Sequence, residues 1–97
     1  MSHTNQSTQA ATVTLTYPVK HGEAEIHELH LRRPKAKDVR EFKLTDLEKF
    51  DKIQSLSAKL SGYPLSVLDD LDLEDLVKCS EVIANFLSNF QKTRENV

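Results

Sequence analysis

The chain is short of the residues on which several classes of protein depend. Its 97 residues include no tryptophan, one cysteine, two glycines and three prolines. Two glycines are too few for a glycine-rich nucleotide-binding loop, and three prolines are too few for a proline-rich linker. The single cysteine, Cys79, can form neither an internal disulfide nor a thiolate metal cluster, which indicates a reducing compartment.

Long apolar runs and a large excess of one charge are missing too. No run approaches the roughly 20 apolar residues that cross a bilayer, and the polar N-terminus does not resemble a signal peptide. Thirteen Lys and Arg stand against 15 Asp and Glu, a net charge of -2, which argues against a protein that coats nucleic acid. We therefore expect one small domain with no membrane, nucleic-acid or small-molecule partner.

The remaining pattern divides the chain into three parts. Residues 1–11 are polar or small and lack periodicity, which predicts a disordered leader. Residues 12–90 carry periodic apolar residues and form the expected single domain, and residues 91–97 are expected to form a flexible tail. We predict an α+β fold for the domain, with an N-terminal β-hairpin followed by about three α-helices that form a small bundle.

Alternation with a period of two predicts the hairpin. Threonines alternate with apolar residues from 12 to 17, Pro18 is expected to end this strand, and Gly22 supplies the turn. A second strand is predicted over residues 24–31. Its apolar residues are spaced three and then two apart, which predicts a bulge near His27–Glu28.

Helical spacing and capping residues predict the rest of the domain. A short helix is expected from Pro34 to about Lys43, and Thr45 with Glu48 matches a capping box for the next helix. That helix has an apolar face and is expected to end at Gly62. The face comprises Leu47, Phe50, Ile53, Leu56 and Leu60. Ser66 and Asp69 repeat the cap pattern for one short turn, and Asp72 is expected to cap a last helix that reaches about Phe90.

The last helix has more apolar surface than one packing face needs. One row contains Leu73, Leu76, Ser80, Ile83, Leu87 and Phe90, and a second contains Cys79, Val82 and Phe86. The helix is either buried in the middle of the bundle, or it keeps one row for the core and offers the other to a partner. On the second interpretation the candidate partner-binding residues are Val82, Phe86, Leu87 and Phe90.

Charge is segregated along the chain. Residues 32–43 contain six basic and two acidic residues, a net charge of +4, and residues 69–75 contain five acidic residues and no basic one. Each patch is either a solvated surface or one side of a contact between two copies. Arg32 and Arg33 are candidates either for a docking patch or for a structural junction that pairs with the acidic segment.

No arrangement of residues indicates catalysis, a metal or a cofactor. His27 and His30 are three residues apart, which places them on opposite faces of a regular strand, and no thiolate or carboxylate completes a zinc site with them and His21. Cys79 lies within an apolar row, as a small buried thiol does. We expect no enzymatic activity.

A helix-turn-helix DNA-binding module is the alternative from another class. Residues 56–68 have the small residues, the glycine and the second apolar run of that motif. Acidic residues at 69–75 would be repelled by phosphates, and the second segment has no Arg, Asn or Gln to read bases.

The order of several segments resembles a known family. They are Leu29-His-Leu-Arg-Arg-Pro-Lys-Ala-Lys-Asp38, Leu60-Ser-Gly-Tyr-Pro64, Val67-Leu-Asp-Asp-Leu-Asp-Leu-Glu-Asp75 and an apolar helix that reaches Phe86-Leu87. In this order, over residues 12–90, they resemble the small tail assembly chaperones of contractile-tailed, Mu-like bacteriophages.

The resemblance implies a non-enzymatic role in the host cytoplasm. Such chaperones bind the long helical tape measure protein, keep it soluble until tail tube subunits polymerise around it, and are absent from the mature virion. They are also associated with a programmed frameshift that gives a longer product. We expect self-association as well, and a structural subunit of the particle is a further alternative with the same oligomer-forming features.

Overall fold

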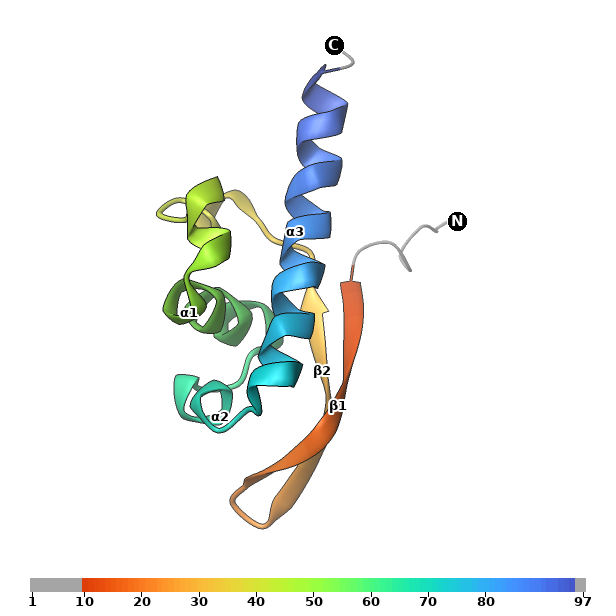
Figure 1. Ribbon diagram of the computed structural model, residues 1–97, viewed down its shortest axis with the longest axis vertical. Helices are drawn as coiled ribbons and strands as arrows, with labels where there is room; N and C mark the ends of the chain where they lie inside the picture. The colour runs from red at the N-terminus through yellow and green to blue at the C-terminus, as the bar shows by residue number, and fades with distance from the viewer. Residues whose placement is uncertain (1–9, 96–97) are drawn as a thin grey trace.

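The computed structural model describes residues 10–95, and the side chains of residues 10–88 except that of Leu44. The elements are β1 (Ala10–His21), β2 (Ala24–Arg32), two 3-10 turns (Ala36–Asp38 and Leu44–Glu48), α1 (Phe50–Ser61), α2 (Leu65–Asp69) and α3 (Leu73–Glu95). In Figure 1 the hairpin and the pair α1 and α2 lie on either side of α3, whose last turns extend beyond the rest of the domain. This arrangement confirms the predicted hairpin followed by three α-helices.

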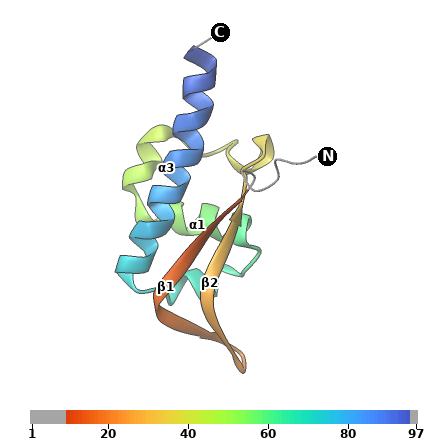
Figure 2. The same cartoon turned by 90° about the vertical axis from the view of Figure 1, so that its right-hand side faces the viewer.

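The hairpin and the helices form two layers. Figure 2 looks from the hairpin side and shows the two strands crossing in front of the helices. α3 packs against β1, α1 packs against β2, and α1 also contacts α3. A two-stranded sheet is marginal by itself in water, and this packing supplies the apolar surface that it needs.

The core lies between these layers and is made of aliphatic side chains from every main element. It contains Val13, Leu15, Val19, Ile26, Leu29, Leu31, Ile53, Leu56, Leu60, Val67, Leu68, Leu76, Cys79 and Ile83. Half-buried aromatic residues such as Phe42, Tyr63 and Phe86 pack around it. Among the described side chains, the Ser57 hydroxyl is the one buried polar group without a hydrogen-bond partner.

The antiparallel ladder is interrupted, but not in the way that the sequence predicts. Thr14 pairs with Glu28 and Val19 pairs with Ile26, so residues 15–18 of β1 lie opposite His27 alone. The irregularity therefore lies at His27–Glu28 as predicted, but the extra residues belong to β1 and not to β2. Pro18 does not end the strand either. It lies in the irregular segment, where its missing N–H interrupts no regular ladder.

Asp75 of α3 binds the irregular segment of β1. Its carboxylate is completely buried and accepts the N–H groups of Thr16, at 2.9 Å, and Tyr17, at 3.1 Å. The Lys78 ammonium lies 3.2 Å from Asp75 Oδ1 and donates to the Thr14 carbonyl at 3.0 Å. Backbone groups that the bulge withdraws from the ladder are thus satisfied by α3, and this contact fixes the helix on the hairpin.

One 3-10 turn, Ala36–Asp38, replaces the helix expected from Pro34 to about Lys43, and a second turn follows at Leu44–Glu48. The Asp38 carboxylate accepts the Lys35 N–H at 2.8 Å, and the Asp46 carboxylate accepts the Lys43 N–H at 2.9 Å. Each aspartate binds the backbone three residues earlier, and this local bond competes with a continuous helix. The predicted Thr45–Glu48 capping box was wrong for the same reason: Asp46 caps the turn, and α1 begins only at Phe50.

The predicted helix ends were partly confirmed. Gly62 takes the left-handed conformation at the end of α1, with φ of 82°. The Asp72 carboxylate accepts the Glu74 N–H at 2.9 Å and caps α3 as expected. Ser66 and Asp69 do not form the predicted cap, because α2 begins after Pro64 and Asp69 accepts a hydrogen bond from Gln54 at 3.2 Å.

The buried face of α3 combines residues from both predicted rows. Leu76, Cys79 and Ile83 are buried, whereas Leu73 is 57% exposed. Phe50, which was expected on the buried face of α1, is 48% exposed. Ile53, Leu56 and Leu60 are buried on this face as predicted, whereas Leu47 is half-buried in the preceding 3-10 turn and not on α1. α3 continues to Glu95, past the end expected near Phe90.

Candidate partner-binding groove

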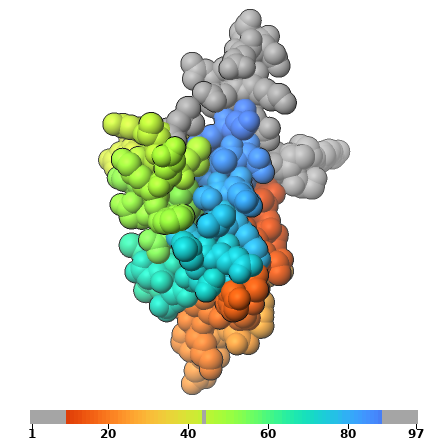
Figure 3. Space-filling view, in the orientation of Figure 1, coloured from red at the N-terminus to blue at the C-terminus, as the bar shows by residue number. Residues whose placement is uncertain are grey.

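An apolar groove lies where the chain leaves β2 and passes α3. Its volume is about 420 Å³, and it is open to solvent on one side. Its apolar lining comes from Pro34, Ala36 and Val39 on the connecting segment and from Phe86 and Leu87 on α3. Segments separated by about fifty positions in the sequence therefore build one surface. In Figure 3 α3 is exposed as a band between α1 and β1.

Three cations surround the apolar lining. Arg33, Lys35 and Arg40 line the groove with exposed side chains, and no aspartate or glutamate is among the described residues of its lining. An apolar surface with a basic rim suits an amphipathic segment of a partner, because apolar contacts supply affinity and the charges select and orient the partner. We call this surface, comprising Arg33, Pro34, Lys35, Ala36, Val39, Arg40, Phe86 and Leu87, the basic groove.

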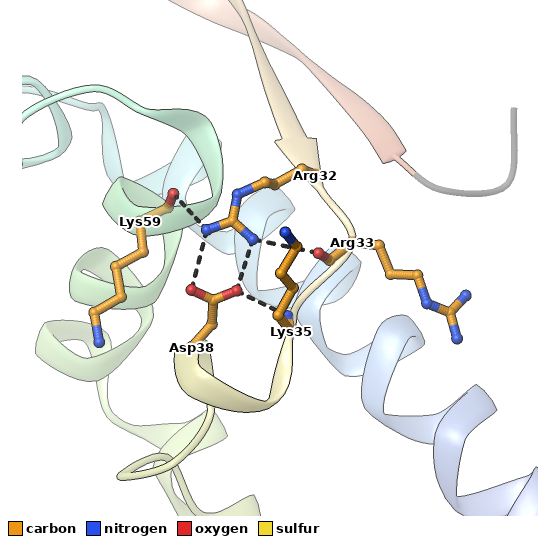
Figure 4. Close-up of polar contacts among 5 residues, drawn as sticks. All are labelled: Arg32, Arg33, Lys35, Asp38 and Lys59. Carbon is orange, nitrogen blue, oxygen red and sulfur yellow. Dashed lines mark hydrogen bonds and ion pairs between the residues drawn. The ribbon is translucent and has the colours of Figure 1, made fainter. Parts of the chain in front are cut away.

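The pair Arg32 and Asp38 holds the connecting segment in shape. The guanidinium donates to both carboxylate oxygens, at 2.6 and 3.0 Å, and makes longer contacts of 3.4 Å with the carbonyls of Arg33 and Lys59 (Figure 4). Hydrogen bonding from Arg32 is the main reason why the pKa of the Asp38 carboxyl lies far below its ordinary value, and the Lys35 N–H contributes to that shift. The Arg33 side chain points away from this pair in Figure 4.

Only some of the partner-binding residues predicted from the sequence line the basic groove. Phe86, Leu87 and Arg33 line the basic groove. Val82 is half-buried against the core and does not line the groove, and the Phe90 side chain lies outside the described residues. Arg32 serves as the structural junction. The expected pairing of the arginines with residues 69–75 was wrong for Arg32, whose partner is Asp38.

Sequence reasoning missed the residues that line the groove opposite α3. Val39 was expected on a short helix, and Lys35 and Arg40 were counted only as part of the basic patch. The sequence signal for the groove was that small and apolar residues, Pro34, Ala36 and Val39, occur within the basic patch. It could not reveal the groove, because the path of the segment depends on the contact between Arg32 and Asp38.

The described residues contain no group of three potential metal ligands. His27 and His30 are exposed, and each contacts the glutamate two residues before it, Glu25 at 3.1 Å and Glu28 at 3.2 Å. Burial raises the pKa of the Cys79 thiol to about 11, so it is a poor nucleophile. None of the described helices is long and apolar enough to cross a membrane.

The helix-turn-helix alternative finds little support in the geometry. α2 has five residues, a single turn, which is too short to lie along a major groove as a recognition helix. Asp69, the last residue of α2, and Asp70, which follows it, are both exposed. A second hollow, of about 290 Å³, has mixed charge, with Asp38, Glu41, Lys52 and Lys59 in its lining.

Comparison with known proteins agrees with the resemblance seen in the sequence. Residues 12–88 match a family model described as "Phage tail assembly chaperone proteins, E, or 41 or 14". No curated protein and no solved structure matched the chain. The match spans both strands, α1, α2 and the part of α3 that lines the basic groove. The family implies a role in assembly and not in catalysis. This chain belongs to the family of phage tail assembly chaperones.

Proposed function

We propose that this protein binds the tape measure protein of a contractile-tailed, Mu-like phage and keeps it soluble until the tail tube assembles around it. The observation that carries the proposal is the basic groove, where Phe86 and Leu87 of α3 meet Pro34 and Val39. A chaperone of this size needs an apolar surface that is accessible to its client, and the groove is such a surface.

The client, on this proposal, needs its apolar surface covered. A tape measure protein, as the resemblance describes it, is a long helix, and its apolar stripe would aggregate in water. A short apolar groove can cover part of such a stripe by helix-in-groove packing. Because many copies bind along one chain, each contact can be weak enough for tail tube subunits to displace it later. On this proposal the protein acts in the host cytoplasm, needs no cofactor and is absent from the mature virion.

Self-association is the second part of the proposal. A groove of this kind is also a natural contact between copies, and opposite charges are separated along the chain. A structural subunit of the particle would share these features. It would, however, remain in purified virions, which distinguishes it from a chaperone that leaves after assembly.

The test is co-expression with the tape measure protein encoded downstream, followed by size-exclusion chromatography with light scattering. We expect the client to become soluble and to elute with several copies of this chain. Phe86→Asp and Phe90→Asp should abolish solubilisation, because a carboxylate would be buried against the apolar stripe. Phe50→Asp is the control, since Phe50 lies on α1, is 48% exposed and does not line the basic groove.

Two results would contradict the proposal. One is a client that stays insoluble with the wild-type chain while that chain retards duplex DNA at physiological salt. The other is full solubilisation by both variants. Because Phe86 packs partly on the core, Arg40→Glu at the exposed rim serves as a second variant that leaves the core intact. It should weaken client binding without changing the circular dichroism spectrum.

A further inference from the structure

The basic groove has a counterpart of opposite charge at the other end of α3. Asp69, Asp70, Asp72 and Glu74 are exposed there, and residues 69–77 include no lysine or arginine. Two large apolar side chains accompany them, Leu73 at 57% exposure and Val77 at 38%. We call this surface, comprising Asp69, Asp70, Asp72, Leu73, Glu74 and Val77, the acidic end.

The apolar part of the acidic end forms a ridge. Leu73 and Val77 are four residues apart on α3, so their side chains lie on one face, one turn above the other. Aspartates and a glutamate flank them. An apolar ridge with an acidic border is complementary in shape and in charge to an apolar groove with a basic rim.

One molecule cannot bring these two surfaces together. Leu73 and Leu87 lie 14 positions apart (87 - 73) on one continuous helix, which separates them by about 21 Å at a rise of about 1.5 Å per residue. Because α3 does not fold back between them, any contact between the ridge and the groove joins two molecules.

We propose that the basic groove of one copy holds the acidic end of a second copy. Leu73 and Val77 lie against Val39, Phe86 and Leu87, while Asp70 and Glu74 approach Arg33 and Arg40. The two surfaces differ, so a single contact leaves a free groove and a free acidic end. Association then continues to larger assemblies, or two antiparallel copies make both contacts at once and close a dimer.

The inference rests on the proposed function only through self-association. It adds a way in which self-association would regulate client binding. If the client also uses the basic groove, a second copy and the client exclude each other, so the free protein covers its own apolar groove. The client then has to displace an acidic end. This contact does not need the client to form, so it is tested on the purified chain alone.

The experiment uses paired charge reversals in the full-length chain. One variant carries Arg33→Glu and Arg40→Glu in the groove, and the other carries Asp70→Lys and Glu74→Lys in the acidic end. Sedimentation equilibrium over a dilution series measures the association constant of each. We expect each variant alone to associate about tenfold or more weakly than the wild type, because like charges then face each other.

An equal mixture of the two variants should recover association, since every groove then finds an end of opposite charge. Raising the salt concentration should weaken both the wild type and the mixture. Lys20→Glu and Glu23→Lys reverse exposed charges near the turn of the hairpin, outside both surfaces, and should leave the association constant unchanged. All four groove and end positions are exposed, and circular dichroism checks that each variant folds.

Three results would each overturn the proposal: a wild-type chain that is monomeric at every concentration, a reversal variant that associates as strongly as the wild type, or a mixture that fails to recover. None of them depends on whether the tape measure protein is solubilised. Failure here therefore leaves the client-binding test intact, and failure of that test leaves this one intact.

Discussion

Asp75 and Asp38 are both buried aspartates that accept backbone N–H groups, but they join parts of the chain at very different separations. Asp75 reaches the N–H groups of Thr16 and Tyr17, 59 and 58 positions away, and connects α3 to β1. Asp38 binds Lys35 and Arg32, three and six positions away, and shapes one connecting segment. The first contact holds the layers of the fold together, and the second shapes the segment that forms one wall of the basic groove.

The contact that joins the layers of the fold is therefore separate from the contact that shapes the groove wall. A substitution at Asp75 should lower stability throughout the domain, whereas a substitution at Arg32 should mainly change the groove. The next three predictions test this separation, beginning with the largest expected effect.

Replacing Asp75 with asparagine should cause the largest loss of stability. The amide can accept one of the two N–H groups, but its NH₂ then faces the other, and the interaction with Lys78 loses its charge. We expect a loss of about 3 kcal/mol in the free energy of unfolding, as for a broken buried charged contact. Urea denaturation measures this. Asp51→Asn, an exposed acid on α1, is the control and should change stability by less than about 0.5 kcal/mol. A similar small value for Asp75→Asn would refute the role assigned to it.

Replacing Arg32 with glutamine should cost less, about 1.5 kcal/mol, because Asp38 keeps the Lys35 N–H and the Arg32 side chain is 41% exposed. Its effect on the groove should be larger than its effect on stability. We expect weaker client binding together with faster hydrogen exchange in residues 33–40. Arg33→Gln, the neighbouring cation that does not contact Asp38, should leave hydrogen exchange unchanged. Equal effects of both variants on hydrogen exchange would remove Arg32 from its structural role.

The smallest effect is a change in acid sensitivity. Burial raises the pKa of the Asp75 carboxyl, but hydrogen bonds from Thr16, Tyr17 and Lys78 outweigh burial and leave the pKa below its ordinary value. The pKa of Asp38 is lowered as well. Both groups therefore stabilise the fold above the unfolded-state pKa of about 3.9, and this contribution is lost as the pH falls through their folded-state values. Stability of the wild type should fall below about pH 4, and the fall should be shallower in Asp75→Asn. An identical slope in both proteins would contradict this assignment.

Local sequence signals predicted most of the fold. Alternation at residues 12–17 and Gly22 located the hairpin, and Gly62 and Asp72 located two helix ends. These features depend on neighbouring residues, so they can be recognised without the rest of the chain. The irregular segment of β1 could not be placed in this way, because its unpaired N–H groups are satisfied by Asp75, far along the sequence.

Some residues of the groove could be predicted from local sequence, and others could not. Phe86 and Leu87 stood out because α3 carries more apolar surface than one face needs. Val39 did not stand out, because its position depends on a 3-10 turn that Asp38 forms in place of a helix. The burial of Cys79 was correctly predicted, whereas the exposure of Leu73 depends on how α3 packs against β1 and α1 and was not revealed by spacing.

The irregular segment of the hairpin also bears on strand-to-strand aggregation of this domain. In a sheet of two strands both strands are edges, and an open edge can template the addition of a foreign strand. Here the edge is interrupted at the place where β1 is irregular. The N–H groups of Thr16 and Tyr17 are already bound to Asp75, and Pro18 has none to offer. A passing extended chain finds no continuous row of donors along β1. The contact that holds α3 on the hairpin therefore also interrupts the edge of β1 on which a further strand could pair.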